Sequence, residues 1–293
     1  MDLEHWLARA WDRHADDPVG VLAELPAAAA SATCDADIDR LLRLAHHIVG
    51  AHQGGPAELA AGRALLARLA ALPAAGPLAQ ASASACGHAL ALTGDEHHPL
   101  AALPGTEALR VQALAAANLA ERQPARAGPL LDAAVAAAEA TGLPDTDPAV
   151  RALAVAGNNI AGTLQELPTR DAAATALMLQ AARLGLQFWR RAGTWLEEER
   201  AHHRLAVCAA AAGDATLARE HAQACAAIVQ REGDVALEAF FAHEAIALAE
   251  AAAGDTAAHA RAVARAQAAF ERLAADDQAW CRTTLDKLAP PLP

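Results

Sequence analysis

The chain has 293 residues, of which 54% are hydrophobic, 20% charged and 3% aromatic, and its formal net charge is −12. Much of the apolar content is alanine, the residue with the best helix propensity, whereas the β-branched and aromatic residues that strands favour are sparse. This composition predicts an all-α protein. The excess acid argues against a nucleic-acid binder, which needs a basic surface to neutralise phosphate.

Several features predict a cytoplasmic protein without a membrane partner. No segment has 18 apolar residues without a charge or a breaker, and the first residues lack the basic and apolar regions of a signal peptide. Lys287 is the single lysine, which we attribute to the coding bias of a GC-rich, bacterial genome. The cysteines are scattered and form neither a metal motif nor a disulfide framework: Cys34, Cys86, Cys208, Cys225 and Cys281.

Turn-forming residues divide the first half of the chain into helix-length segments. Asp17-Pro18 combines a helix cap with proline at the first helical position. The further predicted helices are 35–53, 57–72, 77–94, 106–122 and one that begins at Pro124. The richest turn cluster, 142–148, divides the chain into an N-terminal helical region, 1–147, and a second region, 148–293.

The second half is more regular. Its predicted helices are 148–166, 170–192, 194–212, 214–232, 234–253, 255–274 and 276–288. The connections between them are very short, which is typical of antiparallel helical hairpins.

A turn repeats in this half. Ala212-Gly213-Asp214 and Ala253-Gly254-Asp255 lie about 41 residues apart, and Thr93-Gly94-Asp95 is a weaker third copy. Glycine supplies the left-handed residue that ends one helix, and aspartate caps the next. A step of roughly 40–47 residues between units predicts stacked hairpins that bury one another's faces.

These units resemble the tetratricopeptide repeat family. Gly213, Asp214 and Ala218 match the family's turn, and His259 stands where the next unit should have alanine. The other small or leucine positions that match are Gly162, Ala174, Ala181, Leu205, Ala206 and Cys225. Family repeats have 34 residues, and these are longer. Over about 148–275 the resemblance implies antiparallel hairpins stacked as a right-handed solenoid, with 276–288 as a capping helix and the first helices of each repeat lining a concave groove.

The resemblance also points to a binding surface. Aligning the turns places Asn159, His203 and Glu244 at equivalent positions on successive first helices, while Arg200 and Arg204 share one face of the middle helix. Chaperone-binding members of the family hold a terminal carboxylate with such arginines, although Ile160 stands where they have asparagine. The candidate ligand- or peptide-binding residues are Asn158, Asn159, Arg200, His203, Arg204, Phe241 and Glu244. The alternative is that the arginines pair with Glu197, Glu198 or Glu199 on a solvated helix.

The sequence offers little for catalysis. It contains no nucleophile elbow and no phosphate-binding loop, so we expect neither an enzyme nor a cofactor. Paired histidines are frequent, as in His46-His47, His97-His98 and His202-His203, and we expect most of them to be surface or packing residues. Glu199 and His202 form an E-x-x-H pair, but the second pair that di-iron bundles use is missing.

Three functions therefore remain as hypotheses. The first is a non-catalytic interaction or scaffold protein that receives a peptide, a partner helix or a chain terminus in its groove. The second is a regulatory helical-repeat module that senses a small ligand. The third is a helical metalloprotein that uses Glu199, His202, His203 and His243.

Overall fold

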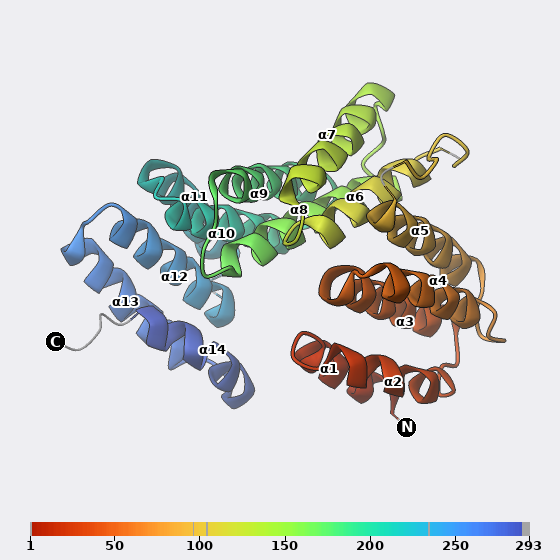
Figure 1. The fold of residues 1–293 in the computed structure, drawn as a ribbon. Helices are drawn as coiled ribbons and strands as arrows, with labels where there is room; N and C mark the ends of the chain where they lie inside the picture. The colour runs from red at the N-terminus through yellow and green to blue at the C-terminus, as the bar shows by residue number, and fades with distance from the viewer. Residues whose placement is uncertain (1, 96, 104, 234, 289–293) are drawn as a thin grey trace. The chain divides into compact units, whose positions relative to one another are not determined.

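The computed structural model describes residues 2–95, 97–103, 105–233 and 235–288 (Figure 1). Within these ranges the chain forms fourteen α-helices and one π-helix and no strand, so the predicted all-α fold class is confirmed. None of the helices in the described ranges is long and apolar enough to cross a membrane. The helices gather into two compact units, one that ends at Pro144 and one that begins at Asp145.

Unit 1 is built around α3. This helix packs against α2, α4 and α5, and the π-helix η1 continues it and contacts α6. The core between these helices consists largely of fully buried leucine and isoleucine side chains, such as Leu25, Ile38 and Leu42. The elements of unit 1 are α1 (Leu3–Arg13), α2 (Pro18–Ala29), α3 (Asp35–His47), η1 (Ile48–Gln53), α4 (Pro56–Ala70), α5 (Pro77–Gly94), α6 (Glu107–Leu119) and α7 (Pro124–Thr141).

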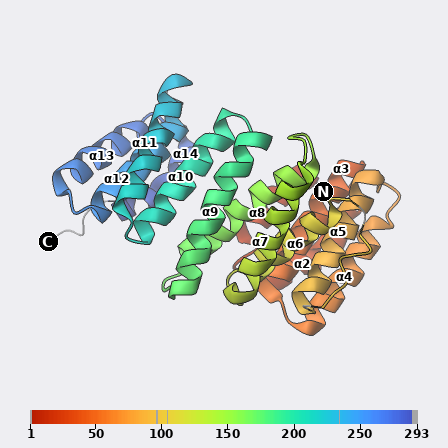
Figure 2. The ribbon, with the colours of Figure 1, turned by 90° about the horizontal axis from the view of Figure 1, so that it is seen from above.

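Unit 2 consists of helices that each pack against the next in the chain. In addition α10 contacts both α8 and α12, and α12 contacts α14; Figure 2 shows the hairpins α10–α11 and α12–α13 side by side. The helices are α8 (Pro148–Glu166), α9 (Ala172–Ala192), α10 (Trp195–Ala211), α11 (Ala215–Arg231), α12 (Ala236–Ala252), α13 (Thr256–Phe270) and α14 (Ala275–Leu288).

The core of unit 2 uses small residues to bring helices close together. One core cluster is made of buried alanines, among them Ala206, Ala218 and Ala245. The closest approach lies between α8 and α9, where a Cβ atom added to Gly157 would be 2.6 Å from the Gly185 backbone nitrogen and 2.7 Å from the Ala181 carbonyl oxygen. These two helices therefore meet backbone to backbone, which only glycine permits at this position.

The two strong copies of the predicted turn have the expected structure. Gly213 and Gly254 have φ angles of +78° and +73°. Asp214 accepts a hydrogen bond from the Leu217 amide at 3.0 Å, and Asp255 accepts one from the Ala258 amide at 2.8 Å. Each glycine thus ends one helix and each aspartate caps the next, as predicted.

The third copy is a different structure, so the prediction of an equivalent turn there is wrong. Gly94 is still helical, as the last residue of α5. Asp95 follows as the C-terminal cap, and its carboxylate accepts a hydrogen bond from the His97 amide at 3.0 Å instead of starting a helix. A longer connection to α6 follows, so no second helix is close enough to require a left-handed glycine.

Candidate functional site

The predicted binding residues lie on the first helices of unit 2, and we call them the first-helix face: Asn158, Asn159, Arg200, His203, Arg204, Phe241 and Glu244. Asn159 is exposed on α8, and Asn158 is half-buried. A Cβ atom on Gly185 would lie 3.1 Å from the Asn158 backbone nitrogen, so this part of the α8 backbone approaches α9. The remaining five residues lie on α10 and α12 and form contacts between helices.

Arg200 is held by a carboxylate from the neighbouring helix. Its Nη2 atom lies 2.6 Å from Glu238 Oε1, and its Nε atom lies 3.3 Å from Oε2. Glu238 is only 4% exposed, and the hydrogen bond that Arg200 donates to this buried carboxylate raises the pKa of Arg200. Arg200 therefore joins α10 to α12, and the partner is not one of the three glutamates on its own helix.

Arg204 lacks such a partner. Its Nη1 atom donates to Gln165 Oε1 at 3.4 Å, and its guanidinium lies against Gly162, where an added Cβ atom would be 3.3 Å from Arg204 Cζ. Its Nε atom is buried and has no hydrogen-bond partner. The ion pairs found among the described residues do not include Arg204. It is the guanidinium of the first-helix face that no carboxylate neutralises.

His203, Phe241 and Glu244 form one group between α10 and α12. His203 Nε2 donates to Glu244 Oε2 at 2.9 Å, and the His203 ring packs edge-on against Phe241 with centroids 5.5 Å apart. Phe241 in turn contacts Trp280 of α14 at 5.4 Å. Trp280 is 65% exposed, so an aromatic surface borders the polar residues of this face.

Glu199, which the sequence places in a possible metal pair, is completely buried. Cys225 Sγ donates to its Oε1 atom at 2.8 Å, while Oε2 has no hydrogen-bond partner. Burial, followed by the nearby Glu238, raises the pKa of Glu199, and burial also raises the pKa of the Cys225 thiol. This side chain is therefore a neutral carboxylic acid in the core, which is a poor metal ligand.

His202 has both ring nitrogens engaged. Arg190 Nη2 lies 3.1 Å from His202 Nε2, and because arginine can only donate, Nε2 must accept. The proton is then on Nδ1, which lies 2.9 Å from His221 Nδ1. Burial lowers the pKa of His202 to about 4, which fits this neutral form. Glu199, His202 and His203 thus contact three different sets of partners, and the structure does not bring them together as ligands.

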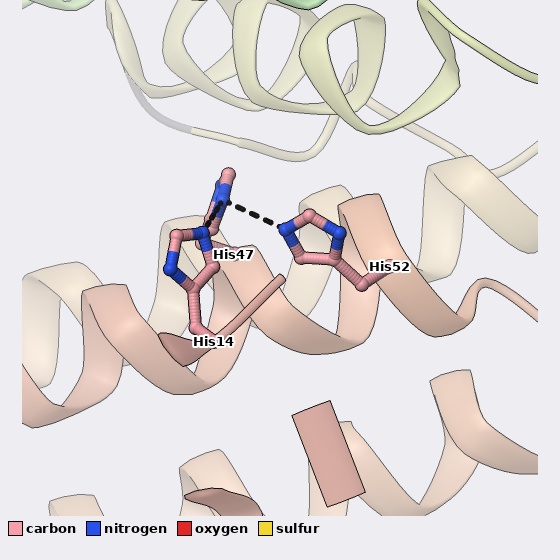
Figure 3. Close-up of side chains that lie close together, drawn as sticks. All are labelled: His14, His47 and His52. Atoms are coloured by element: carbon pink, nitrogen blue, oxygen red, sulfur yellow. Dashed lines mark hydrogen bonds between the residues drawn. The ribbon is translucent and has the colours of Figure 1, made fainter. Parts of the chain in front are cut away.

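A different group of histidines does converge, in unit 1. In the described part of the chain, His14, His47 and His52 are the set whose potential ligand atoms all lie within 4.8 Å of one another (Figure 3). Burial, and then the neighbouring imidazoles, lowers the pKa of His47 to about 3. The pair His46-His47 is visible in the sequence, but nothing in the spacing links it to His14 or His52.

Two cavities of the described structure lie away from all these residues. One of about 160 Å³ lies between α12 and α13, beside Ile246 and Arg261. The other, of about 280 Å³, lies between α4 and α5, beside Leu59 and Leu90. Neither is bordered by a residue of the first-helix face.

Comparison of the chain with protein-family models, with curated proteins and with solved structures gives no match.

Proposed function

We propose that this chain is a non-catalytic, cytoplasmic interaction protein whose first-helix face binds the acidic carboxyl-terminal segment of a protein partner. The proposal extends the resemblance to tetratricopeptide repeats, in which first helices form a concave groove within a right-handed solenoid. The contacts of α10 with α8 and α12 in unit 2 support it. The unpaired thiols, such as the exposed Cys34, support a reducing compartment.

The observation that carries the proposal is the state of Arg204. A half-buried guanidinium without a carboxylate loses hydration, and in exchange it donates only one long hydrogen bond, to Gln165. A ligand carboxylate would compensate this cation and could use two guanidinium donors at once, a geometry that lysine does not offer. Arg200 does not compete for the ligand carboxylate because its guanidinium is already paired with Glu238.

The aromatic neighbours supply the second part of the recognition. Phe241 and Trp280 are in contact, and most of the Trp280 side chain is exposed. Aromatic side chains in such positions are common anchors at protein interfaces. Since Phe241 also touches His203, next in sequence to Arg204, a partner with an apolar side chain near its terminal carboxylate fits this face best.

A peptide array tests the proposal directly. Acidic peptides with free carboxyl termini are compared with the same peptides carrying terminal amides, and selected pairs are titrated against purified protein. Because a charge-assisted hydrogen bond contributes about 1.5–3 kcal/mol, Arg204→Gln should weaken binding of the free acids roughly 10- to 100-fold. The matched control is Arg183→Gln, at an exposed position of α9, which should bind as the wild type does.

Two outcomes would count against the proposal. If free acids and amides bind equally, the terminal carboxylate is not what the protein recognises. If Arg204→Gln and Arg183→Gln bind alike, or if no peptide of the array binds, the assignment of the first-helix face is wrong.

A further inference from the structure

Three separate segments of unit 1 contribute the converging histidines. His14 is the cap residue after α1, His47 is the last residue of α3, and His52 lies in η1. His14 and His47 are 33 residues apart in the chain. Their side chains meet because the hairpin of α1 and α2 packs on α3 and η1.

The π-helix is what brings His52 to His47. In an α-helix, side chains five residues apart point about 140° away from each other, because each residue turns the helix by about 100°. The wider turn of a π-helix, with hydrogen bonds between residues five apart, returns such a pair to the same face. Gly54 donates such a bond to the Val49 carbonyl at 2.8 Å. π turns are rare in proteins overall, but those that occur are often found at functional sites.

A side chain from the turn between α6 and α7 supports this wide turn. Arg122 donates hydrogen bonds to the carbonyl oxygens of Gly50 and Ala51, which have no partner within the helix at its end. The shape of η1 is therefore held by tertiary contacts and is not left to the local sequence.

Two of the three distances between the imidazole nitrogens are close to those around a tetrahedral metal ion, and all three ligand atoms lie within 4.8 Å of one another. His14 Nε2 lies 3.0 Å from His47 Nε2, and His52 Nε2 lies 3.3 Å from the same atom. Zinc–nitrogen bonds of about 2.0–2.1 Å in a tetrahedron place two ligand atoms roughly 3.3 Å apart. Figure 3 shows both outer rings directed at His47.

A hydrogen bond at Nδ1 of His14 fixes the tautomer in which Nε2 is free of a proton, as a metal ligand requires. His14 Nδ1 lies within hydrogen-bond distance of the Trp11 carbonyl oxygen. A carbonyl can only accept, so Nδ1 carries the proton and Nε2 presents a lone pair to His47 and His52. Histidines that bind metals commonly donate their other N–H to a backbone carbonyl, which fixes the ring.

Hydrogen bonding within the cluster does not satisfy all three nitrogens. Since His14 Nε2 has no proton, His47 Nε2 must donate to it. The same N–H then also faces His52, so one proton is shared between two contacts. A cation with several coordination positions would accept lone pairs from all three rings once the His47 proton has moved from Nε2 to Nδ1.

We propose that His14, His47 and His52 bind one divalent transition-metal ion, with Zn²⁺ as the representative ion, through three imidazole nitrogens. His14 and His47 are half-buried and His52 is exposed, so the fourth coordination position faces solvent. Three protein ligands with one open position are the arrangement of zinc sites that bind water or a further ligand. Imidazole ligands suit zinc, copper, nickel and iron, and not the calcium and magnesium that prefer oxygen.

The test uses full-length protein treated with a chelator, desalted and titrated with Zn²⁺ in a calorimeter. We expect one tight site per chain, and His52→Ala and His14→Ala should each weaken it at least about 100-fold, because loss of a ligand should cost no less than loss of a supporting contact. His52 is exposed, so its substitution leaves the helical circular dichroism unchanged. His5→Ala, an exposed histidine on α1, is the matched control and should bind as the wild type does.

A second measurement locates the ion. The Trp11 ring lies 5.1 Å from the His14 ring and 5.4 Å from the His47 ring, measured between centroids. Bound Co²⁺ should therefore quench Trp11 fluorescence, and most of this quenching should disappear in Trp11→Phe. Zn²⁺ retained equally by His52→Ala, His14→Ala and the wild type would overturn the proposal, as would the absence of a tight site or quenching that persists in Trp11→Phe.

Discussion

Replacing Gly157 by alanine tests the close approach of α8 and α9, which supports the first-helix face from behind. The added Cβ atom would lie 2.6 Å from the Gly185 nitrogen and 2.7 Å from the Ala181 oxygen. Both neighbours are backbone atoms, so the helices must separate. Overpacking of this kind costs about 1–3 kcal/mol. The better helix propensity of alanine offsets about 1 kcal/mol of this cost, so we expect a net loss of about 1 kcal/mol, with about 2 kcal/mol as the upper end.

The measurement is the free energy of unfolding, obtained from urea titrations followed by circular dichroism. Gly87→Ala is the matched control because Gly87 lies within α5 and an added Cβ atom there meets nothing within 4 Å. This control should stabilise the protein by up to about 1 kcal/mol, so the two variants should differ by about 2 kcal/mol. If the two units unfold in separate transitions, each substitution should shift only the transition of its own unit.

A Gly157→Ala variant that is as stable as the wild type would contradict the close backbone contact between α8 and α9. Equal changes in the free energy of unfolding for the two glycine variants would contradict it as well, because helix propensity alone would then account for both. In either case α8 and α9 would have room for a side chain at this point, and the first-helix face would be less rigid than described.

Two further predictions concern other parts of unit 2. In the folded protein Glu199 keeps its proton above the unfolded pKa of 4.5. The free energy of unfolding of the wild type, relative to that of Glu199→Gln, should therefore fall as pH rises from 4.5 toward the raised folded pKa, by up to about 1.4 kcal/mol per pH unit. A difference between the two proteins that does not depend on pH would contradict the neutral carboxyl. Gly213→Ala, at φ +78° with no atom near its added Cβ, should lower the free energy of unfolding by about 1–2 kcal/mol from backbone strain alone, and a neutral effect in urea titrations would contradict the left-handed turn.

Much of the helical architecture could be predicted because its signals are local. Proline at the first position and aspartate at the cap act within one turn of helix, so α8 begins at Pro148, as predicted. The helix that begins at Thr256 ends at Phe270, some residues before its predicted end at 274. No strong turn signal stands at that end.

The partners of the candidate residues were harder to predict because they depend on packing between helices. The spacing on α10 places Glu199 beside Arg200 and suggests a solvated ion pair, but Arg200 pairs with Glu238 and Glu199 is buried against Cys225. Both partners lie more than twenty residues further along the chain. No periodicity within one helix indicates which face of it a later helix will cover.

The three-histidine cluster shows the same limit in another form. His14 and His47 belong to different hairpins, and a five-residue spacing between His47 and His52 has no meaning in a regular helix. The cluster depends on a local departure from α-helical geometry that Arg122, in the turn after α6, stabilises.

This departure determines which changes of length the site would tolerate. A π turn contains one residue more than the α-helical turn it replaces, so loss of a single codon between His47 and His52 would let η1 revert to an ordinary helix. Every histidine would still be encoded, and the hydrophobic pattern of α3 would be intact. The two histidines would then be four residues apart, a spacing at which side chains of an α-helix share one face. Among related chains, a histidine pair four residues apart in a regular helix would therefore be equivalent to His47 and His52.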